Sequence, residues 1–205
     1  MSSKLDRVDW PLHTARLTIR PPQRSDLEAT WRIRSDESVS RWITTAPGTL
    51  EEYRKQFEKP ERLAKTLVVE LGGRVIGDLM LAVEDAWSQT EVADQAKDVQ
   101  AELGWCLDPA QQGHGYATEA VEALIRVCFE DLGLRRVTAN CFADNESSWR
   151  LMERVGMRRE MHTVSESLHR SGAWLDGLGY ALLADEWRTR VADGTTASVA
   201  PLGVS

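Results

Sequence analysis

The segment best suited to chemistry is a glycine-rich turn that follows a predicted strand and opens a predicted helix. It reads Gln112-Gly113-His114-Gly115-Tyr116-Ala117-Thr118-Glu119-Ala120. Glycine lets a backbone approach a ligand closely. The first turn of a helix presents unpaired N–H groups and a partial positive charge. The turn is therefore a candidate site for a phosphate or pyrophosphate, although a purely structural turn would also use glycine.

The turn matches neither of the two common nucleotide-binding motifs. When the dinucleotide motif G-x-G-x-x-G is aligned on Gly113 and Gly115, Thr118 stands where a third glycine or an alanine is needed. The sequence also contains no G-x-x-x-x-G-K-[S/T] segment, which excludes a P-loop. A phosphate bound here would belong to another class of ligand.

The cysteines do not suggest a site of their own. Cys106, Cys128 and Cys141 are odd in number and widely spaced, which is not the pattern of a disulfide framework. The sequence holds neither C-x-x-C nor H-E-x-x-H, so no metal site is predicted. We interpret the three as small buried hydrophobic residues. A nucleophilic cysteine would need a histidine partner, which spacing alone does not reveal.

The turn must be positioned by strands and helices that alternate along the chain. Thr49-x-x-Glu52 and Ser25-x-x-Glu28 are capping-box patterns that predict helix starts, and Gly72-Gly73 predicts a tight hairpin turn. The region 86–99 is expected to be a loop insertion. We expect strands at 17–20, 66–70, 75–83, 101–107, 136–142, 158–167 and 174–183, and helices at 26–35, 49–57, 116–132 and 145–155. This order predicts a single mixed α/β domain.

Composition narrows the possible partners and the compartment. The 205 residues include 25 Lys and Arg against 32 Asp and Glu, a net charge of −7, which argues against nucleic acid as the main partner. No N-terminal signal sequence and no run of 18 apolar residues occur, so we expect a cytoplasmic protein that does not bind membranes. We expect the domain to cover 12–188 and the residues 189–205 to form a flexible tail.

The spacing Gln112-x-x-Gly115-x-Ala117 resembles the Q/R-x-x-G-x-G/A signature of the GCN5-related N-acetyltransferase (GNAT) superfamily. Other segments resemble the ribosomal-protein N-terminal acetyltransferase branch, the RimJ/RimL type, in the same order. They are Thr14-Ala15-Arg16-Leu17, Ala101-Glu102-Leu103-Gly104-Trp105, Asn145-x-x-Ser148, Val155-Gly156-Met157 and Glu186-Trp187. The resemblance implies an α/β GNAT fold, with a mixed, mostly antiparallel sheet flanked by helices. Its fourth and fifth strands are expected to splay apart.

The resemblance implies acetyl-CoA as cosubstrate, without a metal. The glycine turn would hold its pyrophosphate. Ser148 would donate a hydrogen bond to the leaving sulfur, although serine is also common in the first turn of a helix. His114 would either help to neutralise phosphate or face solvent. The residues expected to contact the cofactor are Trp105, Cys106, Leu107, Gln112, Gly113, His114, Gly115, Tyr116, Ala117 and Asn145.

The resemblance also places the acyl group beside the strand that contains Glu102. A carboxylate there could take a proton from the acceptor ammonium, directly or through water, or could be an ordinary solvated strand charge. Glu119 is a rival carboxylate, but its place in the signature helix favours local packing or pairing. Backbone N–H groups near 105–107 would polarise the thioester oxygen.

By branch resemblance, the preferred acceptor is the α-amine of a protein N-terminus. The alternatives are a small-molecule amine, namely a polyamine, an amino acid or an aminoglycoside, and a non-catalytic acyl-CoA sensor. Trp42 and Trp87 are expected to line the acceptor groove. The acidic insertion 84–98 is expected near that groove, where its charges could attract a cationic amine. Monomer and homodimer are both compatible with the resemblance.

Overall fold

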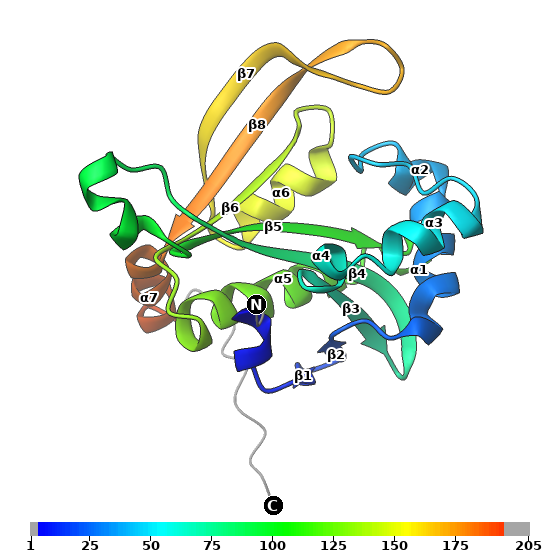
Figure 1. Cartoon of the computed structure of the whole chain (residues 1–205), viewed down its shortest axis with the longest axis horizontal. Coiled ribbons are helices and arrows are strands. Elements are labelled where there is room, and N and C mark those ends of the chain that lie inside the picture. The colour runs from blue at the N-terminus through cyan, green and yellow to red at the C-terminus, as the bar shows by residue number, and fades with distance from the viewer. Residues whose placement is uncertain (1–3, 195–205) are drawn as a thin grey trace, which may run out of the picture.

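The computed structural model describes residues 4–194 and contains one eight-stranded sheet (Figure 1). The strands are β1 (Leu12–His13), β2 (Leu17–Arg20), β3 (Thr66–Leu71), β4 (Arg74–Glu84), β5 (Gln100–Leu107), β6 (Arg136–Phe142), β7 (Arg158–Leu168) and β8 (Trp174–Leu183). Their order in the sheet is β1-β2-β3-β4-β5-β6-β8-β7. All neighbours are antiparallel except the parallel pair β5 and β6. The predicted mixed, mostly antiparallel sheet is confirmed.

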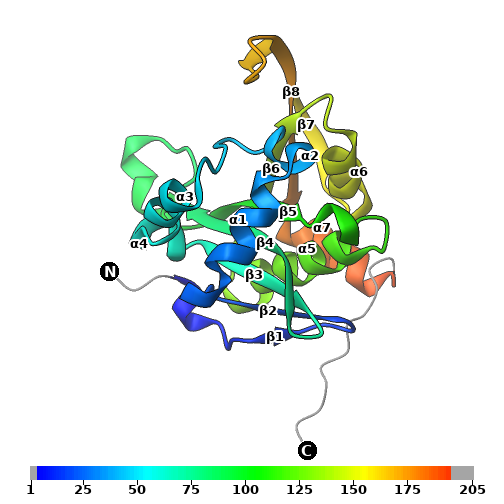
Figure 2. The ribbon, with the colours of Figure 1, turned by 90° about the vertical axis from the view of Figure 1, so that its right-hand side faces the viewer.

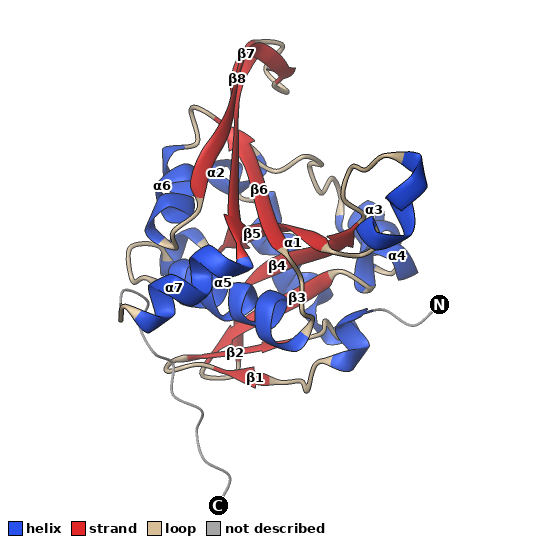
Figure 3. Cartoon of the chain, turned by 90° about the vertical axis from the view of Figure 1, so that its left-hand side faces the viewer, coloured by secondary structure: helices blue, strands red, loops and turns tan. Residues whose placement is uncertain are grey.

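Helices cover both faces of the sheet (Figures 2 and 3). One face carries α1 (Leu27–Ser35), α2 (Glu37–Ser40), α3 (Leu50–Phe57) and α4 (Pro60–Leu63). The other carries α5 (Tyr116–Arg126), α6 (Glu146–Arg154) and α7 (Ala184–Ala192), and α5 continues into a π-helical turn at Val127–Asp131. Short 3₁₀ segments occur at Lys4–Arg7, Arg24–Asp26, Thr90–Ala96 and Pro109–Gln111.

The core lies between the sheet and α5, as the apolar spacing of that helix predicts. Ala120, Val121 and Leu124 are fully buried and belong to one cluster with Leu81 and Leu103 of the central strands. Each large aliphatic side chain buried in this way contributes about 1.5–3 kcal/mol. Because side chains alternate across a strand, the residues between these core positions face α1 instead. The two sides of the central strands are thus available for different tasks.

The parallel pair β5 and β6 separates soon after it begins. The paired residues are Gln100 with Arg136, Ala101 with Val137, and Glu102 with Thr138, and within the described chain no pairing follows. The remaining residues, 103–107 and 139–142, diverge. This is the splay expected between the fourth and fifth strands of the GNAT fold, and it opens the centre of the sheet.

One of the two predicted capping boxes is confirmed. Thr49 and Glu52 cap α3 reciprocally, with the Thr49 N–H donating to Glu52 Oε2 at 2.8 Å. The box predicted at Ser25 and Glu28 is wrong, because a 3₁₀ turn precedes α1. Asp26 takes the role instead, since its Oδ2 accepts from the Gln23 N–H at 2.6 Å.

The C-terminal boundary predicted at Arg188 falls inside a helix. Helix α7 runs to Ala192 because Trp187 packs against Phe129, with ring centroids 5.6 Å apart. The other residues of the predicted tail, from 195 to 205, lie outside the described part of the chain.

Candidate active site

A large cleft of about 1780 Å³ runs through the splay between β5 and β6. Residues of the α1–α4 layer line one side of it, and residues of α5 and α6 line the other. Strand β5 passes between the two sides. Because side chains alternate along a strand, successive residues of β5 point into opposite sides of the cleft.

Glu102 lies on the α1 side of β5. The register pairs Asp78 with Cys106, Met80 with Gly104, and Ala82 with Glu102, so these residues form one row. That row faces α1, because Asp78 is bound by Arg34 of that helix. The Asn140 side-chain amide donates to Glu102 Oε1 at 3.1 Å. The carboxylate is thus held at the edge of the splay, on the α1 side.

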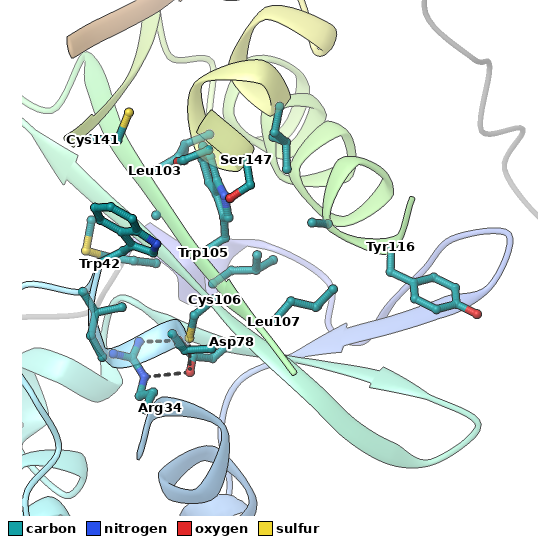
Figure 4. Close-up of a pocket in the computed structure, with 18 of the residues that line it drawn as sticks. Arg34, Trp42, Asp78, Leu103, Trp105, Cys106, Leu107, Tyr116, Cys141 and Ser147 are labelled. Atoms are coloured by element: carbon teal, nitrogen blue, oxygen red, sulfur yellow. Dashed lines mark hydrogen bonds and ion pairs between the residues drawn. The ribbon is translucent and has the colours of Figure 1, made fainter. Parts of the chain in front are cut away.

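Ser148 lies on the opposite side, in the first turn of α6. Its hydroxyl contacts the Cys141 thiol of β6, whose neighbours Ala139 and Val137 are buried in the core. Trp105 and Leu103 project from β5 toward the same helix, as Figure 4 shows. Ser148 and Glu102 therefore line one cleft from opposite faces of the sheet.

The glycine turn lies on the α5 side of the cleft. Gly113 and Gly115 both have φ of +79°, a left-handed conformation that favours glycine, and Gly115 is the N-cap of α5. Apart from the adjacent residues, no heavy atom of the described chain lies within 4 Å of the position that a Cβ of Gly113 would take. The turn thus offers open backbone at the N-terminus of an eleven-residue helix, which suits a pyrophosphate.

Most of the predicted cofactor residues line this cleft, but His114 does not. The set that lines it is Trp105, Cys106, Leu107, Gln112, Gly113, Gly115, Tyr116, Ala117 and Asn145. The His114 ring is exposed and stacks on Tyr116, with centroids 5.6 Å apart. The ring faces solvent in this structure, and its role in neutralising a phosphate stays a prediction. Tyr116 points away from Trp105 and Ser147 in Figure 4.

Arg16, which precedes β2, clamps the glycine turn to the first strands. Its Nη1 donates to the His114 carbonyl at 2.8 Å, and its guanidinium lies 4.5 Å from the centre of the Tyr116 ring. Its Nε donates to Glu119 Oε2 at 2.6 Å, while the Thr14 hydroxyl donates to Glu119 Oε1 at 2.6 Å. Glu119 is thus a structural partner, as expected.

These contacts also determine the ionisation of Glu119. Burial raises the pKa of its carboxyl, but the hydrogen bonds from Thr14 and Arg16 outweigh burial, so the pKa lies below its ordinary value. The carboxylate is therefore charged at neutral pH and supports the clamp.

Sequence reasoning missed a buried ionic network under the α1 side of the cleft. Arg34 donates to both carboxylate oxygens of Asp78, at 2.8 Å through Nε, and the Cys106 thiol donates to the same carboxylate at 3.2 Å. Figure 4 shows this cluster below Trp42. Asp78 is only 2% exposed. A carboxylate inside the apolar run 75–83 was the available signal, since buried charges need partners.

The three cysteines are free thiols, and burial is the main influence on each. Burial raises the pKa of Cys106 to about 12 and that of Cys141 to about 11, with Ser148 opposing the shift at Cys141. Burial also raises the pKa of Cys128 far above its ordinary value. The interpretation as small buried hydrophobic residues agrees with Cys106 and Cys128, whereas Cys141 is only partly buried. The raised pKa values keep all three thiols protonated at neutral pH.

Of the two tryptophans predicted to line the acceptor groove, Trp42 lines the cleft and Trp87 does not. Its ring packs 6.3 Å from Phe142 and 6.0 Å from His169. His169, in the turn between β7 and β8, is buried and binds the Arg41 carbonyl at 2.9 Å through Nε2. The tip of the β7–β8 hairpin is thereby tied to the cleft wall.

The predictions for Trp87 and the insertion 84–98 are wrong. Trp87 is 91% exposed, and no residue of the insertion lines the cleft within the described chain. The reason is topological. The insertion joins β4 to β5 at the end where Glu84 pairs with Gln100, whereas the cleft lies toward the end where Gly77 pairs with Leu107. Figure 1 shows the insertion projecting from the far end of the sheet.

A splayed sheet with an open glycine turn at a helix N-terminus on one side and a carboxylate on the other suits a CoA-dependent acyltransferase. A family model described as an Acetyltransferase (GNAT) domain matches residues 16–158. The chain belongs to the GNAT acetyltransferase family and is an N-acetyltransferase of that type. GNAT acetyltransferases use acetyl-CoA.

Individual relatives agree with this family. YnaD of Bacillus subtilis, an uncharacterized N-acetyltransferase, is 37% identical over 86 residues, which are 42% of this chain and half the length of that protein. YdaF of Bacillus subtilis, named as a presumptive ribosomal N-acetyltransferase, is 28% identical over 83% of this chain and 93% of its own length. The crystal structure of a GNAT acetyltransferase from Bacillus anthracis has a TM-score of 0.72 at 30% identity, covering 86% of this chain and 99% of that one.

More distant structures share the fold and differ in acceptor. The ribosomal L7/L12 α-N-protein acetyltransferase RimL, solved with coenzyme A, has a TM-score of 0.72 and covers 84% of this chain and 97% of its own. Spermidine N-acetyltransferase from Vibrio cholerae, solved with CoA and spermine, has a TM-score of 0.69 and covers 85% and 99%. Both are 20% identical to this chain, so the likeness shows the fold and leaves the acceptor open.

Residues 4–194 contain neither a membrane-spanning helix nor a cluster of metal ligands. Within that part of the chain, no helix has the length and apolar character to cross a bilayer. No group of three or more His, Cys, Asp or Glu side chains comes close enough together there to hold a metal ion.

Proposed function

We propose that this chain transfers the acetyl group of acetyl-CoA directly to the α-amine of a protein N-terminus. One observation carries the proposal: Glu102 and Ser148 line the same cleft from opposite faces of the splayed sheet. A cofactor on the α5 side and an acceptor on the α1 side would meet between β5 and β6. No covalent enzyme intermediate is needed for such a transfer.

The chemistry follows from this division. The neutral acceptor amine attacks the thioester carbonyl, so that a C–N bond forms and the C–S bond breaks. Glu102 takes the proton from the amine, directly or through water. Ser148 donates a hydrogen bond to the departing sulfur, which lowers the energy of the thiolate. Backbone N–H groups of β5 near 105–107 polarise the carbonyl oxygen.

The size and openness of the α1 side favour a peptide. Trp42 and the uncharged loop 43–47 line that side along with residues of α3 and α4. The hairpin β7–β8 stands next to it, held by contacts of His169 with Arg41 and of Arg170 with Ile43. An extended N-terminus can enter such a cleft with its α-amine leading.

The test is release of free thiol from acetyl-CoA with a panel of acceptors. The panel holds peptides with free α-amines, the same peptides with blocked α-amines, spermidine, free amino acids and an aminoglycoside. We expect turnover only of peptides with a free α-amine. Turnover of spermidine or an aminoglycoside with silent peptides would overturn the proposal, and so would binding of acetyl-CoA without turnover of any acceptor.

A further inference from the structure

The α1 side of the cleft has an uneven distribution of charge. Three cations line it on and beside α4, namely Lys59, Arg62 and Lys65, and we call them the basic wall. The wall contains one carboxylate, Glu61. The neighbouring stretch 42–47, which also lines the cleft, has no charged side chain. The chain as a whole is acidic, so this positive patch is a local feature.

Contacts within the described residues do not neutralise the positive charges of the basic wall. Arg62 donates to the Tyr53 hydroxyl at 3.3 Å, and its guanidinium lies 5.0 Å from the centre of the Tyr53 ring. Tyr53 is a neutral partner, so these contacts leave the charge of Arg62 in place. Within residues 4–194, neither Lys59 nor Lys65 forms an ion pair. Arg34, by contrast, is neutralised by Asp78. Positive charge therefore remains available to a ligand in the cleft.

The sheet register gives the distance from the basic wall to the reaction centre. The Lys65 carbonyl accepts from the Leu81 N–H at 2.9 Å, and Leu81 pairs with Leu103 of β5. Adjacent strands lie about 4.8 Å apart, so the backbone of Lys65 is about 10 Å from β5 next to Glu102. An extended peptide advances about 3.3–3.6 Å per residue. The side chains of its second to fourth residues would thus reach the wall while the α-amine lies at Glu102.

We propose that the acceptor is a protein N-terminus with a carboxylate side chain among residues two to four, which the basic wall binds. This inference rests on the proposed function and adds the chemistry of the acceptor sequence. The wall also assists the reaction, because nearby positive charge lowers the pKa of an ammonium group and increases the fraction of neutral amine. The same charges repel a polyamine.

The experiment compares two peptides that differ only in charge. The acidic peptide is Ser-Asp-Glu-Leu-Gly-Ala, and its amide twin is Ser-Asn-Gln-Leu-Gly-Ala. We expect kcat/KM of the native protein to be at least about tenfold higher for the acidic peptide, a difference of about 1.4 kcal/mol. The preference should shrink as the salt concentration rises from about 0.05 to 0.5 M, because salt screens exposed charges.

Two double variants identify the charges responsible. Lys59→Glu with Lys65→Glu should remove the preference, because kcat/KM for the acidic peptide should fall at least about tenfold further than kcat/KM for the amide twin, a difference of about 1.4 kcal/mol. The matched control, Lys55→Glu with Lys97→Glu, makes the same change in net charge at exposed lysines that do not line the cleft, and should keep the preference.

Equal kcat/KM for the two peptides in the native protein would overturn the inference. So would an equal loss of preference in the control variant. Turnover of both peptides at the same rate would leave the proposed function standing, whereas turnover of spermidine with both peptides silent would remove the proposed function itself.

Discussion

The carboxylate of Glu102 owes its position to a residue on the neighbouring strand. Asn140 donates to Glu102 Oε1 at 3.1 Å, just beyond the point where β5 and β6 stop pairing. The side chain therefore stands at the mouth of the splay and still has its second oxygen for a substrate or a water. This position is compatible with the general-base role that we propose for Glu102.

Replacement of Glu102 tests that role. Glu102→Gln keeps the size and the hydrogen-bonding capacity but cannot accept a proton, so kcat should fall by about 100-fold or more, while KM for acetyl-CoA stays the same. Steady-state kinetics with a peptide acceptor make the measurement. The control is Glu84→Gln, an exposed position of β4 that does not line the cleft. An unchanged kcat in Glu102→Gln would exclude Glu102 as the base.

A second residue-scale prediction concerns stability. Asp78→Asn leaves the guanidinium of Arg34 beside the cleft without its anionic partner, and the loss of one member of a buried pair costs about 3–5 kcal/mol. Urea unfolding should show this decrease in the free energy of unfolding. Glu28→Gln removes a partner from the exposed pair with Arg32 and should cost less than about 1 kcal/mol. Equal effects of the two variants would contradict the buried network.

At the scale of elements, the glycine turn depends on the first strands for its shape. Arg16 and Thr14 flank the start of β2, and they bind Glu119 of α5 and the carbonyl of His114. The turn is thus attached to the β1–β2 edge of the sheet. In the order of the strands, this edge is farther from the splay than the β7 edge is. We regard Arg16 as a positioning residue, since its contacts run to the protein.

Loss of Arg16 should weaken cofactor binding more than it slows the reaction. We expect Arg16→Ala to raise KM for acetyl-CoA about tenfold, equivalent to about 1.4 kcal/mol, with kcat at saturation within about twofold. Arg24→Ala, which removes an exposed ion pair with Glu58, is the control. A fall in kcat without a change in KM would show that Arg16 does not act through the turn.

The contacts of Glu119 with Thr14 and Arg16 should also make the free energy of unfolding depend on pH. The folded-state pKa of Glu119 lies below its ordinary value of 4.5, so its stabilising effect is complete above pH 4.5 and is lost as pH falls through the lowered pKa. The difference in unfolding free energy between the native protein and Glu119→Gln should therefore be constant from about pH 6 to 8 and shrink below about pH 4.5. Urea unfolding across that range would measure it, and a difference that grows toward low pH would contradict the assignment.

The two ends of the sheet should respond differently to loss of a tryptophan. Trp42 lines the acceptor side of the cleft, whereas Trp87 is exposed on the insertion at the far end. We expect Trp42→Ala to raise KM for the peptide by about tenfold, equivalent to about 1.4 kcal/mol, and Trp87→Ala to leave kcat/KM within about twofold. Peptide kinetics decide between them, and a large effect at Trp87 would place the acceptor elsewhere.

At the scale of the whole molecule, most of the fold could be predicted from local sequence patterns. The apolar spacing of α5, the hairpin at Gly72-Gly73 and the capping box at Thr49 depend on residues close in sequence, and all three were predicted. The contacts that complete the site join distant residues. Glu102 and Asn140 are 38 apart, Arg34 and Asp78 are 44 apart, and Arg16 and Glu119 are 103 apart. No short-range pattern predicts such pairs.

The error at Trp87 has a different cause. The insertion enters β5 at its first residue, and the glycine turn follows its last residue. The two segments are therefore separated by the length of the strand. For the eight residues of β5 this is roughly 25 Å. The family resemblance predicted that the insertion lies near the acceptor groove. The antiparallel pairing of β4 with β5 instead places it at the opposite end of β5 from the glycine turn.

We propose that the splayed sheet receives the cofactor on its α5 side and a peptide on its α1 side. The most direct measurement is a crystal structure with a bisubstrate analogue, in which the sulfur of CoA is joined through an acetyl bridge to the α-amine of a peptide. We expect the pyrophosphate at Gly113 and Gly115, the sulfur next to Ser148, and the peptide nitrogen within hydrogen-bond or one-water reach of Glu102. A peptide on the α5 side, or a nitrogen remote from Glu102, would contradict this proposal.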